Sequence, residues 1–373
     1  MPHGSSAGRY GGALLTVRPD TQADLLAAAR SAFRSGDWET SYAAFSRAGA
    51  IGPLSVDDLD AMAGAAWHSG HDREAMRVGE LVYVRLTRTD PNSAATKAVD
   101  LGTAWLSRGD VTAGHSWIRR ARGLLVGAAD SSVLVRLTYL ETVVAVLTDD
   151  DERVAERSAA LRDVSTRVPQ SESVAFDLGD VLDERRLAAL GRALEGAHSL
   201  AAGQAYYQLG EVRRRRGDVD GAMAAYAAAF DLGVAPQPGE ALLRCSLGDV
   251  DAAWAEIQAA IAAADERARP GLLRGAVEIA LARGDVDEAE HHFHELEAAG
   301  ATDTLLRARL LLGRGRFSDA LVVLRAALRE YRMRESQQQA AEAYRWMAAA
   351  HRGLGADDLA AADEAAAGLH GGG

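Results

Sequence analysis

The residues best suited to chemistry lie in one short stretch, where His291, His292 and His294 are flanked by Glu290 and Glu295. His291 and His294 are three residues apart, so on a helix their two imidazoles would share one face. Zinc sites take three or four protein ligands, and two imidazoles are an incomplete set. We therefore expect a solvated surface here, with no metal site and no cofactor.

Two other features offer reactive side chains without a recognisable site. The acidic run from Asp149 to Glu152 lacks the spaced oxygens and the glycine of an EF-hand loop, and we expect a charged turn that also caps a helix. Cys245 is the single cysteine, which excludes an internal disulfide and fits a reducing cytoplasm. We expect it to be a structural thiol.

The sequence contains no recognisable catalytic motif. It has no G-x-S-x-G elbow, no H-E-x-x-H pair and no strand pattern that would carry a dinucleotide fingerprint. The only lysine, Lys97, has no P-loop glycines before it. We therefore expect a protein that is not an enzyme, although a constellation assembled from distant helices stays open.

The bulk properties exclude other classes. The formal charge of −12 over 373 residues argues against non-specific affinity for nucleic acid or for anionic membranes. No apolar run approaches the ~20 residues that span a bilayer. We expect an all-α chain, because prolines are few and alanine is frequent throughout. We expect it to be cytoplasmic, because the single cysteine fits a reducing compartment.

The element that organises the chain runs from Gly203 to Pro236 and reads as two helices joined by a tight turn. Gly217-Asp218 breaks the first helix, since glycine suits the left-handed position after a helix and aspartate caps the next one. Gly210 and Ala222 are small where the two helices must approach closely. One such hairpin cannot bury its apolar face alone, so copies must stack.

Similar turns recur along the chain. Glycines at the turns of eight clear copies are Gly36, Gly70, Gly109, Gly217, Gly248, Gly284, Gly315 and Gly355. From Gly36 to Gly109, and again from Gly217 to Gly355, successive turn glycines are 31 to 40 residues apart. This spacing is close to the ~34-residue period of helical-hairpin repeats. Two degraded copies lie between Val133 and Leu200: Asp149-Asp150-Asp151 replaces the glycine turn in one, and Gly179-Asp180-Val181 looks like a turn in the other.

The spacing predicts five segments. A disordered tail covers residues 1–21, a first sub-array 22–166 and a second sub-array 201–369, with a short tail at 370–373. Residues 167–200 are either a truncated repeat or a bend between the sub-arrays.

This pattern resembles the tetratricopeptide repeat (TPR) family, whose hairpins carry small residues at the eighth, twentieth and twenty-seventh positions. In the central copy these are Gly210, Ala222 and Ala229. The resemblance implies an α-α superhelix, a TPR-like solenoid of about nine to ten hairpins, that acts by binding a protein or peptide.

Longer stretches resemble the repeat region of large actinobacterial LuxR-type transcriptional regulators. They are 209–218, 238–244 and 337–369. In such regulators the repeats sense a partner or ligand and a C-terminal helix-turn-helix binds DNA. This sequence stops at Gly373, where that domain would begin, so the resemblance implies a sensing or docking array without it. We expect no direct DNA binding.

In stacked hairpins of this family the first helix of each copy lines the concave face. Transferring the register of the central copy predicts the residues that face this groove. They are Phe33, Trp67, His68, Tyr207, Glu211, Arg214, Arg215, Arg274, Glu278, Leu305, Arg309, Arg345 and Arg352.

Two interpretations of these residues stay open. From Arg214 onward most of the charges are arginines, whose planar guanidinium pairs bidentately with carboxylate or phosphate. They would bind an acidic peptide or another anionic ligand, or else pair with neighbouring Glu and Asp on a solvated face. Phe33 and Trp67 would form an aromatic pocket, or else belong to the core between repeats.

The sequence thus predicts a non-catalytic scaffold that holds a protein or peptide partner in its groove. The alternative is a ligand-responsive regulatory array that binds a small molecule. Self-association is a further expectation, because the final alanine-rich helix makes a poor cap.

Overall fold

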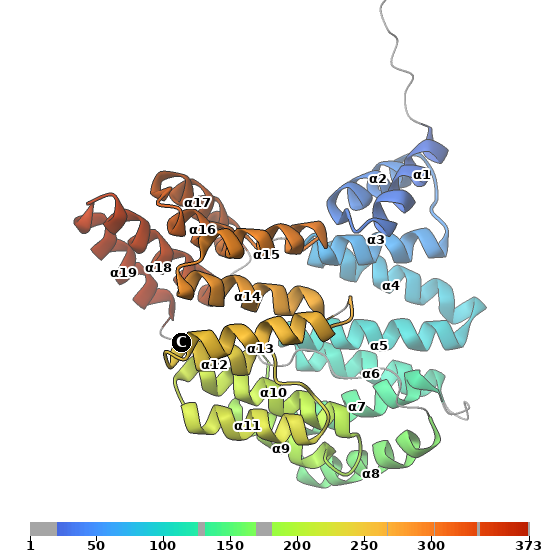
Figure 1. Ribbon diagram of the computed structural model, residues 1–373. Helices are drawn as coiled ribbons and strands as arrows, with labels where there is room; N and C mark the ends of the chain where they lie inside the picture. The colour runs from blue at the N-terminus through green and yellow to red at the C-terminus, as the bar shows by residue number, and fades with distance from the viewer. Residues whose placement is uncertain are drawn as a thin grey trace, which may run out of the picture. The chain divides into compact units, whose positions relative to one another are not determined.

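The computed structural model describes residues 21–125, 131–168, 181–266, 268–301, 303–333 and 336–371. Throughout these ranges the regular structure is helical, without a strand (Figure 1). The helices are α1 (Gln22–Arg34), α2 (Trp38–Ile51), α3 (Val56–His68), α4 (Asp72–Thr89), α5 (Pro91–Ser107), α6 (Val111–Leu124), α7 (Ser132–Leu147), α8 (Asp151–Arg167), α9 (Glu184–Leu194), α10 (Ser199–Arg216), α11 (Val219–Asp231), α12 (Gly239–Ser246), α13 (Val250–Ala263), α14 (Arg269–Arg283), α15 (Val286–Ala298), α16 (Thr304–Gly313), α17 (Phe317–Met333), α18 (Gln337–Gly353) and α19 (Asp357–Gly371).

All eight predicted turn glycines have left-handed backbone, with φ between +71° and +92°. An L-side chain is strained in this region, so glycine ends the first helix and reverses the chain. The aspartate that follows often caps the second helix. Asp37, Asp110, Asp218 and Asp285 each accept a hydrogen bond from the backbone N–H three residues further on. The Gly-Asp signature therefore acts as the sequence predicts at these four turns, whereas Asp249 makes no side-chain cap for α13.

The acidic run forms the same turn without glycine. Asp149 has φ +53° and is the one non-glycine residue with positive φ in the described ranges. Its carboxylate accepts hydrogen bonds from Arg185 and Arg186, at 2.5 and 2.8 Å. Asp150 caps α8 by accepting from the Arg153 N–H. The predicted charged, helix-capping turn is confirmed.

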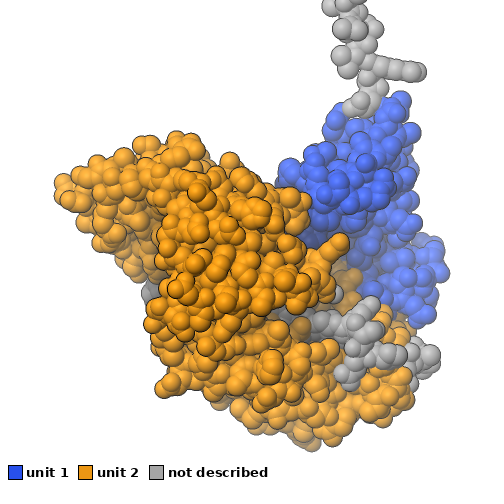
Figure 2. Space-filling model, in the orientation of Figure 1, with its two compact units in different colours: residues 1–97 blue, residues 98–373 orange. Residues whose placement is uncertain are grey.

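The chain divides into two compact units, residues 1–97 and 98–373 (Figure 2). Within unit 1, α1–α2 and α3–α4 are antiparallel hairpins, and α3 packs against both helices of the first. Their shared core includes Leu25, Phe45, Met62 and Val82.

Within unit 2 the hairpins stack through their first helices. Contacts run from α10 to α12, then to α14, α16 and α18, while each first helix also packs on its own second helix (Figure 1). Core residues such as Ile257, Leu273 and Phe293 fill the space between successive hairpins. The face that one hairpin cannot bury is thus covered by the next, as repeat stacking requires.

In the second degraded copy the described residues include helix α9. α9 packs against α7, α8 and α10, and its predicted turn, 179–181, lies mostly outside the described residues. Glu184, which stands where the repeat has alanine, is the first residue of α9 and accepts hydrogen bonds from Arg213 and Arg216. The sub-array boundaries near residues 166 and 201 stay a prediction.

Gly210 lies at a close approach between helices, as expected. A Cβ atom added there would lie 2.4 Å from the Tyr226 ring, so α10 and α11 can pack at this separation only because position 210 has no side chain. Ala222 and Ala229 are fully buried in the same hairpin.

Candidate functional site

The predicted groove residues of unit 2 lie on four first helices, and we call this set the first-helix row. It comprises Tyr207, Glu211, Arg214 and Arg215 on α10, Arg274 and Glu278 on α14, Arg309 on α16, and Arg345 and Arg352 on α18. Leu305, also predicted to face the groove, is instead buried in the core between α16 and α18.

At the α10 end, Glu211 and Arg214 are locked into a half-buried cluster. The Arg214 Nε and Nη2 atoms donate to the two Glu211 carboxylate oxygens, at 3.1 and 2.8 Å. The Tyr226 hydroxyl donates to Glu211 Oε1 at 2.5 Å. A Cβ atom on Gly239 would clash with both Glu211 and Tyr226, so the start of α12 closes over the cluster.

The opposite charges of Glu211 and Arg214 compensate each other within the cluster. Burial by itself would raise the pKa of Glu211, but the hydrogen bonds and charge of Arg214 outweigh burial and lower it. Burial likewise opposes the charge on Arg214, yet its hydrogen bonds to Glu211 raise its pKa. Burial raises the pKa of the Tyr226 hydroxyl. The two charged groups therefore satisfy one another and do not await a partner.

Further along the row, Glu278, Arg309 and a tryptophan form a second contact chain. Arg309 Nη1 lies 2.9 Å from Glu278 Oε2, which joins α16 to α14. The same guanidinium lies over the Trp346 ring at 4.8 Å from its centroid, which joins α16 to α18. The transferred register therefore brings residues about 30 residues apart into direct contact.

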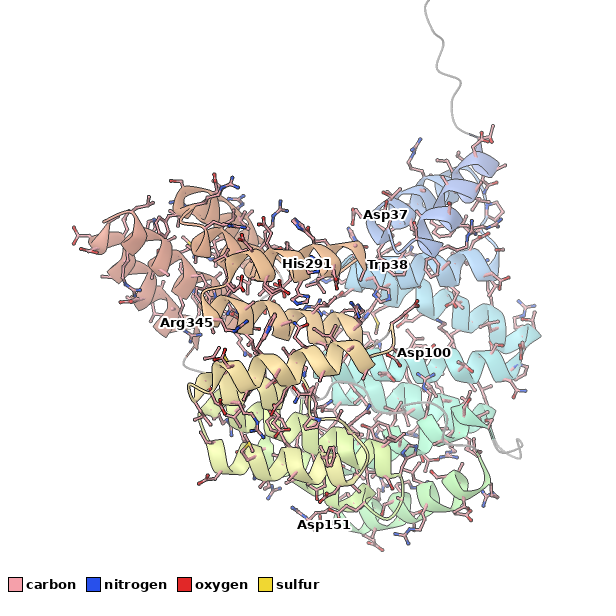
Figure 3. The ribbon with its side chains drawn as sticks, in the orientation of Figure 1. Asp37, Trp38, Asp100, Asp151, His291 and Arg345 are labelled. Atoms are coloured by element: carbon pink, nitrogen blue, oxygen red, sulfur yellow. The ribbon has the colours of Figure 1, made fainter. Side chains whose placement is uncertain are left out.

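The remaining arginines of the row differ in their partners. Arg274 Nε lies 3.4 Å from a carboxylate oxygen of Asp303, and Arg352 is paired with Glu364 on α19. Arg215 is exposed, and its hydrogen bond within the described part of the chain goes to the Glu211 backbone carbonyl. Arg345, on α18, is also exposed (Figure 3). Among the described residues, neither of these two has a carboxylate within ion-pair distance.

The predicted aromatic residues of unit 1 form a cluster with an unexpected member. Phe33 packs edge-to-face on Trp38 with ring centroids 5.3 Å apart, and Trp38 stacks on His68 at 4.5 Å. Trp38 and Asp37 begin the second helix of the first hairpin (Figure 3). Trp67 is 37% exposed and makes no ring contact with this cluster. The rings in contact are therefore Phe33, Trp38 and His68, and the choice between a binding pocket and a core role for Phe33 and Trp67 stays a prediction.

Sequence reasoning missed the partners that close these contacts. Tyr226, Trp346 and Asp303 lie outside the stripe that the register assigns to the groove. Trp346 directly follows the stripe position Arg345 on α18, and its large ring could have signalled a contact. Nothing in the sequence marks the Tyr226 hydroxyl as the partner of Glu211.

The histidine-rich segment also differs from expectation. On α15 the ligand atoms of His291, His292 and Glu295 all lie within 4.8 Å of one another. His294, which the sequence pairs with His291, is exposed and is not in this group. The two histidines and the one glutamate of this group offer nitrogen and oxygen ligands rather than thiolates.

The repeated geometry decides the fold class: glycine-turned helical hairpins stack through their first helices within unit 2. The fold is TPR-like. Gly210 and the buried Ala222 and Ala229 occupy the small positions that the family pattern requires. No helix in the described part of the chain combines the length and apolar character needed to cross a membrane.

Among known proteins, the chain is similar to several solved structures. No family model matches the chain, and no curated protein matches it either. Among solved structures, a tetratricopeptide repeat protein from Parabacteroides merdae is similar, with 14% identity over 79% of this chain and 98% of that chain, at a TM-score of 0.37.

Two further solved structures cover more of the chain. The apo form of the quorum sensor NprR from B. thuringiensis shows 9% identity over 94% of this chain and 87% of that chain, at a TM-score of 0.38. The APC/C hetero-tetramer Cut9-Hcn1 shows 12% identity with the same coverage and a TM-score of 0.42. At these values the alignments carry no functional inference.

Proposed function

We propose that the chain is a non-catalytic scaffold that binds an acidic protein or peptide along the first-helix row of unit 2. The supporting observation is the pairing of charges in that row. Arg214, Arg309, Arg274 and Arg352 each have a carboxylate partner within the chain. Arg215 and Arg345 do not have one among the described residues, and both are exposed.

The two exposed arginines are therefore the contacts for a partner's carboxylates. An exposed guanidinium gives up only loosely held water when it forms a bidentate pair, so it adds specificity at modest cost. The internally paired arginines fix the shape of the surface between them. The predicted groove residues Tyr207 and Glu278 then belong to that frame.

The experiment is a calorimetric titration of the full chain with an acidic peptide, such as a short oligoglutamate, and with a neutral peptide of equal length. We expect the acidic peptide to bind and the neutral peptide not to bind. In the Arg215→Ala/Arg345→Ala variant the affinity for the acidic peptide falls about tenfold or more, because each lost charged hydrogen bond is worth about 1.5 kcal/mol. A matched control is Arg325→Ala/Arg329→Ala, which removes two exposed arginines from the second helix α17.

An equal loss of affinity in both double variants would show a non-specific charge effect and would contradict binding along the first-helix row. A thermal shift with small metabolites but no heat from any peptide would favour the alternative, a ligand-responsive array related to LuxR-type regulators. The proposed compartment is the cytoplasm, since Cys245 is unpaired.

Self-association is proposed on the last helix. Leu359 and Leu369 of α19 are 54% and 86% exposed, and a second copy would cover them. Monomer alone in light scattering at high concentration would remove this idea.

A further inference from the structure

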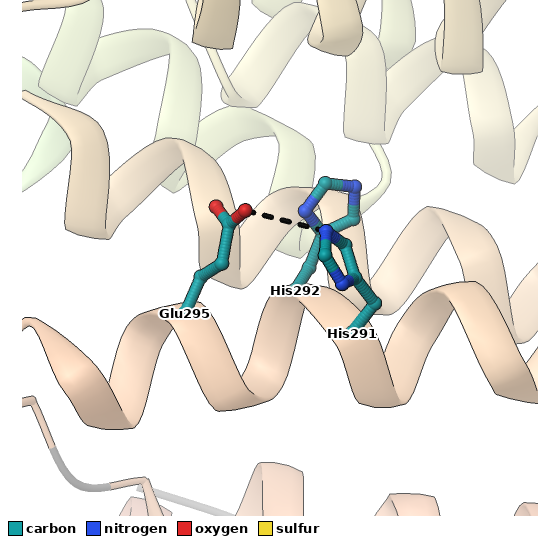
Figure 4. A group of neighbouring side chains, drawn as sticks. All are labelled: His291, His292 and Glu295. Carbon is teal, nitrogen blue, oxygen red and sulfur yellow. Dashed lines mark ion pairs between the residues drawn. The ribbon is translucent and has the colours of Figure 1, made fainter.

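Helix α15 carries three potential metal ligands in close proximity: His291, His292 and Glu295 (Figure 4). His291 and Glu295 are four residues apart and so lie one above the other on the helix. The His291 Nε2 atom lies 3.3 Å from Glu295 Oε1, a separation at which one ion could bridge both atoms.

His292 completes the group from the interior. Its side chain is only 6% exposed, and its Nε2 atom lies 2.9 Å from the Gln258 side-chain amide on α13. The Glu288 carboxylate is 3.6 Å from the same nitrogen. The other ring nitrogen, Nδ1, is buried and has no hydrogen-bond partner among the described residues. Such an orphaned polar atom is uncommon in folded proteins and calls for an explanation.

A metal ion supplies that explanation. Ligating histidines usually bind the metal through one ring nitrogen and donate the N–H of the other to a carboxylate, a carbonyl oxygen or water. In this structure the Gln258 amide reaches His292 Nε2 through its nitrogen. With Nδ1 on the metal, Nε2 carries the proton, and it would donate to the Gln258 amide oxygen after a flip of that amide, with the Glu288 carboxylate nearby. Glu295 is held in the same way, because its Oε2 accepts a hydrogen bond from Arg269 Nη2 at 2.9 Å. Its Oε1 remains directed at His291.

The charge state of the group also suits a cation. The carboxylates of Glu288 and Glu295 lie near His292, against one guanidinium, that of Arg269. The surroundings are therefore net negative.

We propose that His291, His292 and Glu295 bind one divalent ion of the zinc class, with water in the remaining position. Two imidazoles and a carboxylate are a ligand set that zinc accepts in sites with an open coordination position. Nitrogen ligands disfavour Mg²⁺ and Ca²⁺, which prefer oxygen. Binding ties the surface of α15 to α13 through His292 and Gln258, so the metal stabilises this hairpin interface.

The test is a calorimetric titration of tag-free, EDTA-treated full chain with ZnCl₂, followed by the visible spectrum of the Co²⁺ form. Zn²⁺ binds at one equivalent and raises the unfolding temperature, because an ion that binds only the folded state stabilises it. MgCl₂ gives no effect.

Three variants report on the ligands. His291→Ala and Glu295→Gln change side chains on the surface side of α15 and abolish stoichiometric binding. His292→Gln retains a polar group that reaches Gln258 but lacks Nδ1, and it abolishes binding too. The unfolding temperature in EDTA shows whether this buried variant remains folded; if it does not, the two surface variants decide. Gln258→Leu, which removes only the outer contact, weakens binding about tenfold.

His294→Ala is the matched control, because His294 is an exposed histidine on the same helix. It leaves the affinity unchanged. Loss of binding in His294→Ala equal to that in His291→Ala would overturn the proposed ligand set in favour of non-specific surface coordination. Absence of a one-equivalent Zn²⁺ transition in the unmodified chain would overturn the site altogether.

Discussion

Arg214 and Arg352 occupy the same position in two repeats, three residues before the turn glycines Gly217 and Gly355. Arg214 has a side chain 24% exposed and donates two hydrogen bonds to Glu211 inside a cluster closed by Tyr226. Arg352 is 53% exposed and pairs with Glu364, itself 54% exposed.

The difference shows that the repeat register fixes where a side chain starts but not what it does. At α10 a tyrosine from α11 and the start of α12 enclose the ion pair, so it belongs to the frame. At α18 the pair joins α18 to α19, and about half of each side chain is exposed. An arginine stripe read from the sequence therefore mixes structural and available guanidinium groups.

The largest expected effect comes from removing the enclosed arginine. Arg214→Ala leaves the Glu211 carboxylate half-buried without its counter-charge, which costs about 2 kcal/mol of the free energy of unfolding. Arg352→Ala, the matched variant, costs about 0.5 kcal/mol or less, because exposed pairs contribute little. Urea unfolding of both variants, followed by circular dichroism, measures the difference. Equal losses would break the comparison.

Lowering the pH should destabilise the fold through Glu211, at the α10 end of the first-helix row. The pKa of Glu211 is below its ordinary value in the folded chain, so its ionisation stabilises the fold above the unfolded-state pKa, and this contribution is lost as the pH falls through the lowered folded-state pKa. Stability of the unmodified chain declines from roughly pH 5 downward. The decline is shallower in Glu211→Gln. Thermal melts from pH 7 to pH 3 measure it, and identical slopes would contradict the assignment.

A smaller loss of stability is expected when the Tyr226 hydroxyl is removed. Tyr226→Phe removes one hydrogen bond to a charged acceptor and keeps the packing against Gly210, so it costs about 1.5 kcal/mol or somewhat less. The control is Tyr206→Phe. The Tyr206 hydroxyl contacts the exposed Glu195, so its loss costs only about 0.3 kcal/mol of the free energy of unfolding. Urea midpoints compare them, and a larger loss at Tyr206 would locate the anchor elsewhere.

The turns and hairpins of this chain follow from its sequence alone. Gly217, followed by Asp218, dictates a helix end and a helix start through local sterics and one short-range hydrogen bond, and the eight turn glycines all adopt the predicted left-handed backbone. The hairpins and their stacking follow, because each leaves an apolar face that only another hairpin covers. The register also located Glu278 and Arg309 on neighbouring first helices.

Only the tertiary structure decided which of the predicted residues are paired. The Tyr226 hydroxyl reaches Glu211 from another helix, Glu278 meets Arg309 across a repeat, and His292 rather than His294 lies beside His291 and Glu295. These contacts depend on side-chain direction and on the burial that adjoining helices impose, whereas turn formation depends on a few consecutive backbone angles. Local rules therefore determined the repeat, and packing between repeats determined its chemistry.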